Sequence, residues 1–458
     1  MKKYPGMKYK LTIKIFTISA VILFSMIKSL DAQDQKINLT LKEAVDLCLK
    51  NSKQLKNSLA KITEASAALQ QAKDQRLPDF KVSGSYLRLN NPNVDLKTSS
   101  NNNNGGSGNG NSNNLKVDQA LYGLVSISYP IYSGLRIRYG IESAKYLEQA
   151  AKLDADQDRE AVMLNAIDAY INLYKSKAAV LLVKENLSQS KQRDLDFTNL
   201  EKNGILARND LLKSELQTSN IELSLLDAEN TLKLANLNMD LLLGLPDKTE
   251  IVQDSASLQA PGQLDDIAVF ETSAIQRRKD AQALVSRQKA AGSAIQSARS
   301  EYYPGLALTG GYVAADIPGL FTVSNAVNIG LGLQYNLSSL WKTKAKVDQA
   351  KARQDQLLAN EEILADQIKY QVSDAYNNYL LTLKKIDVYE KAIDQSLENF
   401  KIIQNKYDNS LATTADLLEA DVARLQAKLN HAFAKADAIA AYNKLMQSAG
   451  LLYEDKAH

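Results

Sequence analysis

The sequence predicts a mainly α-helical protein with a small β part, built from two copies of one long repeat. Three observations support this fold class: the repeat itself, two pairs of alternating segments, and two very long stretches without Gly or Pro. The repeat appears when residues 67–89 are compared with 293–315, and residues 129–212 with 335–418. A repeat of this length indicates one supersecondary unit used twice.

Matching residues place the two copies in register. The first copy is longer, and its extra residues fall in the Asn/Ser/Gly-rich stretch from Ser99 to Asn114. Such low-complexity sequence has few side chains to bury, so we expect a solvated loop there. The matched pairs include Pro78 with Pro304, Tyr129 with Tyr335, Asp168 with Asp374, and Asp210 with Asp416.

The chain begins with a Lys-rich segment followed by an apolar run from Ile15 to Ile27. With Leu30-Asp31-Ala32 as a cleavage site, residues 1–32 are expected to be a secretory signal peptide. Removing them takes away more Lys than Asp, so the formal charge of +3 becomes slightly negative. A mature chain of that charge lacks the basic footprint of nucleic-acid-binding proteins.

The rest of the chain contains one cysteine, Cys48, so no intramolecular disulfide can form. Its place within a predicted helix favours a small buried apolar side chain. Beyond the signal peptide no apolar run approaches the roughly 20 residues of a membrane-spanning helix, so any membrane insertion would use β-strands.

The repeat divides the mature chain into two parts. Each repeat is expected to contain, in order, a helix, a β-hairpin, a long helix and a returning helix. The first repeat spans 33–248 with its hairpin at 80–131, the second spans 265–450 with its hairpin at 305–337, residues 249–264 link them, and 451–458 form a tail.

The opening helix of each repeat has a marked start and end. Residues 40–43 fit a capping box in the first repeat, and the acids at 265–266 favour a helix N-terminus in the second. Each helix is expected to end near Pro78 or Pro304, because proline disfavours helical backbone in the residue before it.

Alternating apolar and small polar residues follow each proline, which is the pattern of a β-strand with two different faces. Four such segments occur, two in each repeat. Ser, Thr, Gly and Asn dominate the positions between the apolar ones. The apolar positions are Phe80, Val82 and Tyr86; Leu121, Val125, Ile127 and Tyr129; Leu306, Leu308 and Tyr312; and Val327, Ile329, Leu331, Leu333, Tyr335 and Leu337.

Strands of about ten residues are long enough to cross a bilayer when tilted. Tyr86 and Tyr312 fall near the loop ends of their strands, while Tyr129 and Tyr335 fall near the helix ends. Two such aromatic belts are typical of membrane-spanning barrels. The alternative is a soluble sheet that packs on its apolar face.

Four strands cannot close a barrel. Transmembrane barrels have at least about eight strands, and open sheet edges do not occur in lipid, so a membrane-spanning sheet would require several chains. The connections at 90–119 and 314–326 are long and polar, which suits an exterior face. The sequence therefore predicts an oligomer.

Very long helices are expected after each hairpin, because residues 141–203 and 341–449 contain neither Gly nor Pro. Polar turns at 203–207 and 409–413 would reverse the chain at the far end. The returning helices would end at glycines 244 and 450. A coiled-coil seam with spacings of three and four residues is formed by Val372, Tyr376, Tyr379, Leu383, Ile386 and Ile393.

This order of elements, with the two tip turns and the prolines at the strand entries, resembles the TolC-like outer-membrane efflux proteins. The resemblance covers residues 39–452 and implies a homotrimer in the bacterial outer membrane. It implies a twelve-stranded transmembrane β-barrel, four strands from each chain, continued by a periplasmic α-barrel of long antiparallel coiled-coil helices. It also implies a periplasmic adaptor (membrane fusion) protein and an inner-membrane transporter as partners, in efflux or type I secretion, with no cofactor.

Roles at the periplasmic entrance are implied by the same resemblance. Asp416 and Glu419 occupy the places of two acids that narrow the pore and attract cations, and their spacing puts both on one helix face. Tyr407 and Asp210 fit an aromatic and an acid that bond between neighbouring tips. A plainer interpretation is that Asp416 only caps its helix, because residues 413–416 fit a capping box.

Closure of the entrance is expected to differ from the family pattern. Ala412 stands where the family has a basic latch residue, which leaves Arg208 or Lys213 as candidates. The residues expected to contact an adaptor at the tips are Gly204, Ile205, Leu206, Ser410, Leu411 and Ala412.

Two other classes of function were weighed. An enzyme is disfavoured, because the two histidines, His431 and His458, lie in a helix and at the terminus, with no phosphate-binding loop, metal-ligand cluster or nucleophile–base pair. A periplasmic or surface coiled-coil scaffold or adhesin would share the long helices. It gives no reason for the four alternating strands.

Overall fold

The computed structural model describes residues 36–90, 117–247, 249–254, 264–318 and 320–452. The expected signal peptide, the Asn-rich stretch and residues 453–458 of the tail lie outside the described residues. The described chain divides into two compact units. Unit 1 takes its residues from Met1–Lys56, Asp158–Ile275 and Ile368–His458, and unit 2 consists of Asn57–Gln157 and Gln276–Gln367. Each unit therefore combines parts of both repeats.

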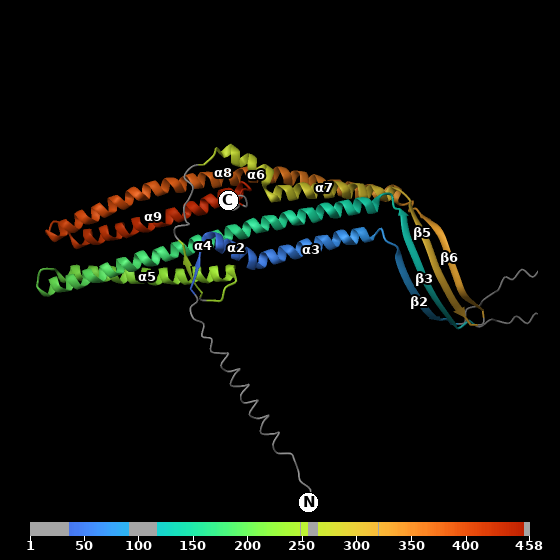
Figure 1. Ribbon diagram of the computed structural model, residues 1–458, viewed down its shortest axis with the longest axis horizontal. Coiled ribbons are helices and arrows are strands. Elements are labelled where there is room, and N and C mark those ends of the chain that lie inside the picture. The colour runs from blue at the N-terminus through green and yellow to red at the C-terminus, as the bar shows by residue number, and fades with distance from the viewer. Residues whose placement is uncertain (1–35, 91–116, 248, 255–263, 319, 453–458) are drawn as a thin grey trace, which may run out of the picture. The chain divides into compact units, whose positions relative to one another are not determined.

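Four long helices dominate the fold, as the absence of Gly and Pro predicts (Figure 1). In the first repeat α4 (Arg136–Lys202) is followed by α5 (Arg208–Leu243). In the second repeat α8 (Ser339–Asp408) is followed by α9 (Thr414–Ser448). Within unit 1 the predicted seam is confirmed, because Tyr379 is fully buried and packs with Leu383 and Ile386 against Ala438 of α9.

The opening helix of each repeat is broken in two, where one helix was expected. In the first repeat α2 (Leu41–Asn51) and α3 (Lys53–Asp74) meet at Ser52, whose hydroxyl accepts a hydrogen bond from the Leu55 amide at 3.2 Å. In the second, α6 (Ile267–Arg277) and α7 (Lys279–Arg299) meet at Arg278, whose backbone is extended. Neither break contains Gly or Pro, so the usual sequence signal is missing.

The Thr40 capping box is formed as predicted, and Cys48 lies buried on the inner side of α2. Burial raises the pKa of the Cys48 thiol. The prolines also act as expected, since α3 ends shortly before Pro78, and α7 with the short 3-10 helix η3 (Ser300–Tyr302) ends before Pro304.

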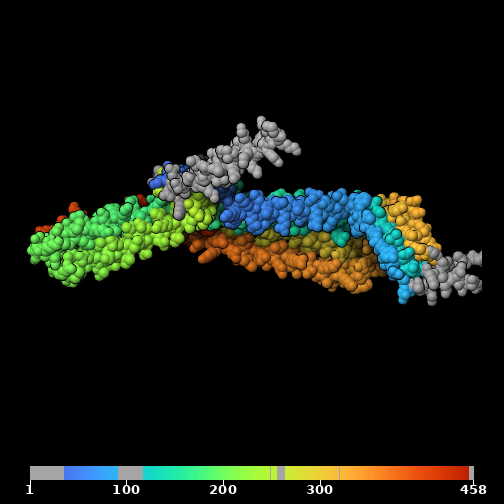
Figure 2. Space-filling model, turned by 90° about the horizontal axis from the view of Figure 1, so that it is seen from below, coloured from blue at the N-terminus to red at the C-terminus, as the bar shows by residue number. Residues whose placement is uncertain are grey.

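Unit 2 contains one four-stranded sheet in the order β2-β3-β5-β6. The strands are β2 (Asp79–Arg88), β3 (Gln119–Tyr132), β5 (Gly305–Ile317) and β6 (Phe321–Gln334), and all neighbours are antiparallel. The two predicted hairpins thus lie side by side. Figure 2 shows the blue β2 strand at the surface of unit 2, where it forms one edge of the sheet.

The register puts all four predicted apolar sets on the same face. Directly paired residues share a face of a sheet. Phe80 pairs with Ile127, and Val125 pairs with Tyr312. The opposite face carries small polar residues, because Ser128 pairs with Thr309. The alternation seen in the sequence is therefore confirmed for the predicted apolar residues that lie within the four strands.

Two boundaries of the second hairpin were predicted wrongly. Residues 314–326 were expected to form a long loop, but β5 continues to Ile317 and β6 begins at Phe321. A bulge lies between the pairs Val313–Ala326 and Ala315–Val323, so β6 has one residue more than β5 there, and the alternation of β6 breaks while the pairing continues. At its other end β6 stops at Gln334, because the Asn336 side chain accepts hydrogen bonds from Ser338 and starts the turn into α8.

A second, two-stranded sheet in unit 1 was missed by the sequence analysis. Strand β1 (Lys36–Leu39) pairs in parallel with β4 (Glu250–Gln253), which lies in the expected linker. The hydroxyl of the buried Tyr170 on α4 donates to the Leu39 carbonyl at 2.8 Å and holds β1 in place. Four-residue strands are too short to give a reliable alternation signal.

Candidate functional site

Unit 1 brings the two tip turns together. Gly204 and Ser410 have left-handed backbone, with φ of 72° and 60°. The amide of Ile205 bonds to the Leu200 carbonyl at 2.9 Å, and the amide of Leu411 bonds to the Lys406 carbonyl at 2.7 Å. With the matching bonds from Gly204 and Ser410, each turn is a Schellman motif, the common end of an α-helix.

The two returning helices start differently. Before α9, the Thr413 hydroxyl accepts a bond from the Asp416 amide at 3.2 Å, and the Asp416 carboxylate accepts one from the Thr413 amide at 2.8 Å. This is a complete capping box. Before α5, Ala207 stands at the corresponding position and forms no side-chain cap.

The acidic pair lies on the exposed face of α9. Asp416 and Glu419 are exposed, whereas Leu417 and Ala420 between and beside them are buried. Hydrogen bonds from the Thr413 backbone and hydroxyl lower the pKa of the Asp416 carboxyl. The capping box predicted at residues 413–416 is thus formed, and both acids remain exposed to solvent.

Tyr407 is held mainly by an aromatic contact. Its ring stacks on Phe197 of α4, with centroids 5.6 Å apart and planes inclined by 25°. Its hydroxyl accepts a long bond of 3.5 Å from Thr414. Asp210 pairs instead with Lys213 at 3.1 Å, so the structure of one chain does not bring Tyr407 and Asp210 into a hydrogen bond.

An apolar core lies beneath this stacking contact. Phe197, Leu211 and Leu417 are buried there, which joins α4 and α5 of the first repeat to α9 of the second. Surrounding side chains complete the cluster: Leu200, Leu206, Phe400, Ile403 and Tyr407. The two tips therefore share one core within a single chain.

The latch candidates named from the sequence pair within the first repeat. Lys213 binds Asp210, as described above, and Arg208 lies 3.9 Å from the Glu201 carboxylate. Both basic side chains are largely exposed. Neither forms a described ion pair with the second repeat.

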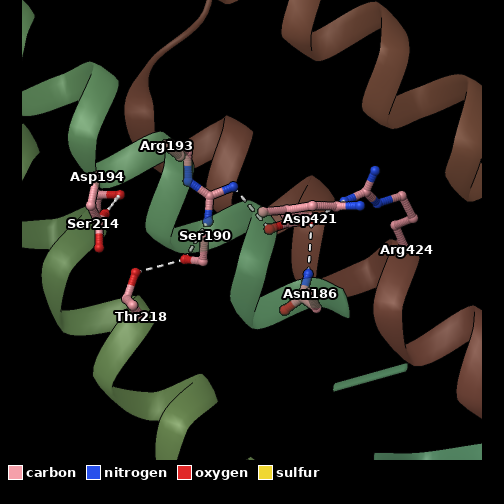
Figure 3. Close-up of polar contacts among 9 residues, drawn as sticks. Asn186, Ser190, Arg193, Asp194, Ser214, Thr218, Asp421 and Arg424 are labelled. Atoms are coloured by element: carbon pink, nitrogen blue, oxygen red, sulfur yellow. Dashed lines mark hydrogen bonds and ion pairs between the residues drawn. The ribbon is translucent and has the colours of Figure 1, made fainter. Parts of the chain in front are cut away.

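A buried polar cluster joins the repeats instead (Figure 3). Asp421 of α9 accepts hydrogen bonds from Arg193 of α4 at 2.9 Å and from Arg424 at 2.6 Å. Asn186 of α4 donates to the same carboxylate at 3.2 Å. The Asp421 side chain is only 3% exposed, so two guanidinium groups and an amide compensate its burial.

The cluster continues toward α5. The Arg193 guanidinium also donates to Ser190 at 2.9 Å, and the Ser190 hydroxyl lies 2.7 Å from that of Thr218 (Figure 3). The sequence analysis missed this site. Arg424 aligns with Thr218 of the other repeat, so the charged partner is present in one copy only and no repeated motif marks it.

A groove of about 640 Å³ runs beside this cluster. Phe197, Tyr407 and Arg424 are among the residues that line it, and the Arg424 guanidinium lies 3.9 Å above the Phe400 ring. The groove combines aromatic walls with cationic groups. It is open along the surface of unit 1.

The histidines and acidic residues weighed in the sequence have the following places in the structure. No group of three or more His, Cys, Asp or Glu side chains lies close enough there to hold a metal ion. His431 lies in α9, where burial lowers the pKa of its imidazole, and His458 falls outside the described residues. Among the described helices, none is both long enough and apolar enough to span a membrane.

Comparison with known proteins shows the relationship of the whole chain. The sequence matches the family described as outer membrane efflux protein over residues 44–245 and 272–451. It is 23% identical over 405 residues to the outer membrane protein OprJ of Pseudomonas aeruginosa, covering 86% of this chain and 80% of that protein. It is 21% identical to the outer membrane efflux protein BepC of Brucella suis over 343 residues, 72% of each chain.

Solved structures show the same fold. The outer membrane protein VceC of Vibrio cholerae is similar with a TM-score of 0.72 and 20% identity, over 90% of this chain and 96% of that one. The outer membrane channel CmeC of Campylobacter jejuni gives a TM-score of 0.74 and 18% identity, over 90% and 86%. With its duplicated helices, joined hairpins and shared tip core, this chain belongs to the outer membrane efflux protein family.

Proposed function

We propose that three copies of this outer-membrane protein form a channel that serves as the exit duct of a tripartite efflux pump. The observation that carries the proposal is the sheet of unit 2, whose four apolar sets share one face while its two edges, β2 and β6, remain unpaired in the described chain. Backbone groups cannot remain unpaired in lipid. Pairing β2 of one chain with β6 of the next closes the sheet, and three chains give twelve strands.

Many side chains on the face that would line the barrel are small. Ser126 pairs with Gly311, and Thr309 pairs with Gly330. A Cβ added at Gly311 would meet the Val125 carbonyl oxygen at 2.7 Å. The same face also carries Asp79 and Lys81, which form an ion pair of 2.9 Å. The small residues elsewhere on this face leave room for a water-filled lumen, as the exit duct for many small molecules requires.

Asp416 and Glu419 form the charged part of the proposed entrance. Threefold symmetry would place six carboxylates around one axis at the tips of the helices. Their exposure supports this role, because charge that is not neutralised by a partner concentrates cations in a narrow opening.

The contact that holds the entrance closed is proposed to be the Arg193–Asp421 ion pair, since this chain has Ala412 where the family has a basic latch residue. The pair joins α4 to α9 and is shielded from water, whereas Arg208 and Lys213 pair inside the first repeat. Opening the entrance by separating the two helix pairs would break this contact. The Tyr407 ring would then act by stacking on Phe197.

The tips are proposed to contact a periplasmic adaptor protein that connects the channel to an inner-membrane transporter. Ile205 and Leu411 occupy matching positions after the two left-handed residues and are 73% and 76% exposed. Exposed apolar side chains at two equivalent turns suit docking of a protein partner. Because the family and the relative BepC are both named for efflux, we assign small molecules rather than secreted proteins as cargo.

Conductance of the purified protein in planar bilayers tests the channel and its entrance together. Trimers that resist mild SDS and dissociate on heating, with ion conductance that prefers cations, are the expected result. Asp416→Asn with Glu419→Gln should reduce the cation preference. The matched control is Asp46→Asn with Glu64→Gln, two exposed acids away from the tips that remove the same charge. A monomer without conductance would refute the channel, and equal effects of both variants would refute the acidic entrance.

A further inference from the structure

Four segments of unit 2 meet at the helix end of the four-stranded sheet. The helix α3 leads into β2 and the helix α7 leads through η3 into β5, while α4 follows β3 and α8 follows β6 (Figure 1). The Lys346 ammonium of α8 donates to the Glu301 carboxylate of η3 at 2.6 Å. This contact links the junction before β5 to the junction after β6. Under the proposed function this end of the sheet lies at the inner leaflet of the outer membrane.

Basic residues lie in the first two turns of the two helices that start there. Arg136 and Arg138 open α4, Lys342 and Lys344 follow the start of α8, and neither helix has an acid in its first turn. We call these four residues the collar. All four are exposed, and none forms an ion pair among the described residues.

This placement opposes the ordinary preference of helices. The N-terminus of a helix carries partial positive charge, so acids stabilise it and basic residues disfavour it. Among the described helices, α2, α5, α7 and α9 follow this preference with Glu43, Asp210, Asp280 and Asp416 in their first turns, whereas α3 and α6 have no acid there. A negative partner would therefore stabilise the positive charge at the starts of α4 and α8.

Exposed aromatic and apolar side chains lie in the same junctions as the collar. Trp341, the one tryptophan of the chain, is 66% exposed and directly precedes Lys342. Tyr303 before β5 is 59% exposed, and Leu340 and Leu337 are exposed beside Trp341. Tyrosine and tryptophan with flanking basic residues are enriched at the depth of lipid headgroups.

We propose that the collar binds the phosphate groups of anionic phospholipids, with the exposed Trp341 and Tyr303 placed at the level of the lipid headgroups. Two helix N-termini and four long cationic side chains together present positive charge toward a layer of phosphates. Charge complementarity and the adjoining apolar side chains fit a lipid headgroup better than a free anion. The proposal rests on the membrane placement of the sheet given above.

The test uses the purified trimer with phosphatidylglycerol and phosphatidylcholine of the same acyl chains, measured by native mass spectrometry. Wild type should retain more phosphatidylglycerol, and each collar charge removed should weaken its binding about fivefold. The variant combines Arg136→Gln, Arg138→Gln, Lys342→Gln and Lys344→Gln. The matched control carries the same change at four exposed lysines of α8 outside unit 2: Lys369, Lys385, Lys391 and Lys401.

A second measurement excludes a merely structural effect. In a neutral detergent without anionic lipid, the collar variant should be as heat-resistant as wild type or more so, because the removed charges oppose the helix dipoles. Wild type should gain heat resistance when phosphatidylglycerol is added, and the variant should lose that gain. Fluorescence of Trp341 should shift to the blue with the same lipid.

Three results would overturn the proposal. These are equal retention of the two lipids by wild type, equal loss in the collar and control variants, and displacement of phosphatidylglycerol by an equal concentration of glycerol phosphate, which would indicate a free-anion site. Failure of the channel itself would appear separately, as loss of the trimer and of conductance in wild type.

Discussion

Arg193 of α4 and Asp421 of α9 form an ion pair of 2.9 Å that joins the first repeat to the second. The side chains are 11% and 3% exposed, and Arg424 binds the other oxygen of the same carboxylate. Because both side chains are buried, water cannot easily solvate one of them if the other is removed. The buried polar contact between the repeats near the tips is thus centred on one carboxylate, beside the apolar core that they share.

Replacing Asp421 by Ala should therefore destabilise unit 1 strongly. Two guanidinium groups would remain buried without their counter-ion, at a cost of about 3–5 kcal/mol. The control is Asp437→Ala, which breaks the more exposed pair with Lys175 and should cost at most about 1 kcal/mol. Guanidinium-induced unfolding of the detergent-solubilised protein measures both. Similar losses in the two variants would contradict the central place given to Asp421.

The left-handed backbone of Ser410 lowers the stability of its turn. Its φ of 60° is unfavourable for a residue with a Cβ, whereas Gly204 at the equivalent turn adopts 72° freely. Ser410→Gly should stabilise the protein by about 0.5–1 kcal/mol, and Gly204→Ala should destabilise it by about 1 kcal/mol. Nothing lies within 4 Å of a Cβ at Gly204, so the second effect would be purely conformational. The temperature at which the trimer dissociates measures the effect of each variant. If both variants raised it, or both lowered it, the two turns would not share the left-handed backbone described here.

Tyr407→Phe separates stacking from hydrogen bonding. Among the described residues the hydroxyl forms only the 3.5 Å bond with Thr414, so its loss should change stability by less than about 1 kcal/mol and leave conductance unchanged. Phe197→Ala removes a buried ring from the shared core and should cost about 3–5 kcal/mol. Single-channel recordings measure the conductance of both variants, and unfolding experiments measure their stability. A wider opening in Tyr407→Phe would show that the hydroxyl bonds to a neighbouring chain.

The charge of Asp416 should survive to lower pH than that of an ordinary aspartate. Hydrogen bonds from Thr413 hold the pKa of its carboxyl below the usual 3.8. A carboxyl with a lowered pKa stabilises the folded state above its unfolded pKa, and this contribution is lost as pH falls through the folded pKa. In a Glu419→Gln background, the added change Thr413→Ala should move the loss of cation preference to higher pH.

Reversal potentials recorded from about pH 7 down to about pH 3 check this expectation. The same titration in the variant Asp416→Asn, again with Glu419→Gln, gives the baseline without either carboxylate. An unchanged midpoint after Thr413→Ala would mean that the capping bonds do not control this carboxyl.

Much of the sheet could be predicted because its signal is local. Alternation of Phe80, Val82 and Tyr86 gives both the strand and its two faces, and the repeat predicts the same for the second hairpin. The bulge of β6 between Val323 and Ala326 could not be seen, because an extra residue changes the alternation without ending the strand. The order β2-β3-β5-β6 required the structure, since joining β3 to β5 is a pairing between distant segments.

The tip turns and the acids of α9 could also be placed from the sequence, whereas the polar cluster could not. Arg193 and Asp421 lie in long helices whose exposed faces carry many other charges. Only the crossing of α4 and α9 distinguishes this pair from solvated ones. Likewise β1 has four residues and meets β4 far along the chain, so neither strand has a sequence signal of its own.

The two tip turns have the same backbone hydrogen bonds although one is built on Gly204 and the other on Ser410. Since main-chain bonds alone define the bend, the side chains around it are free to diverge after gene duplication. One copy has Thr413 and Glu419 where the other has Ala207 and Lys213, with no change in the path of the chain, while both keep an acid, Asp416 or Asp210. After the duplication, the side chains at each of the two tip turns could therefore change independently, without altering the backbone of the other turn.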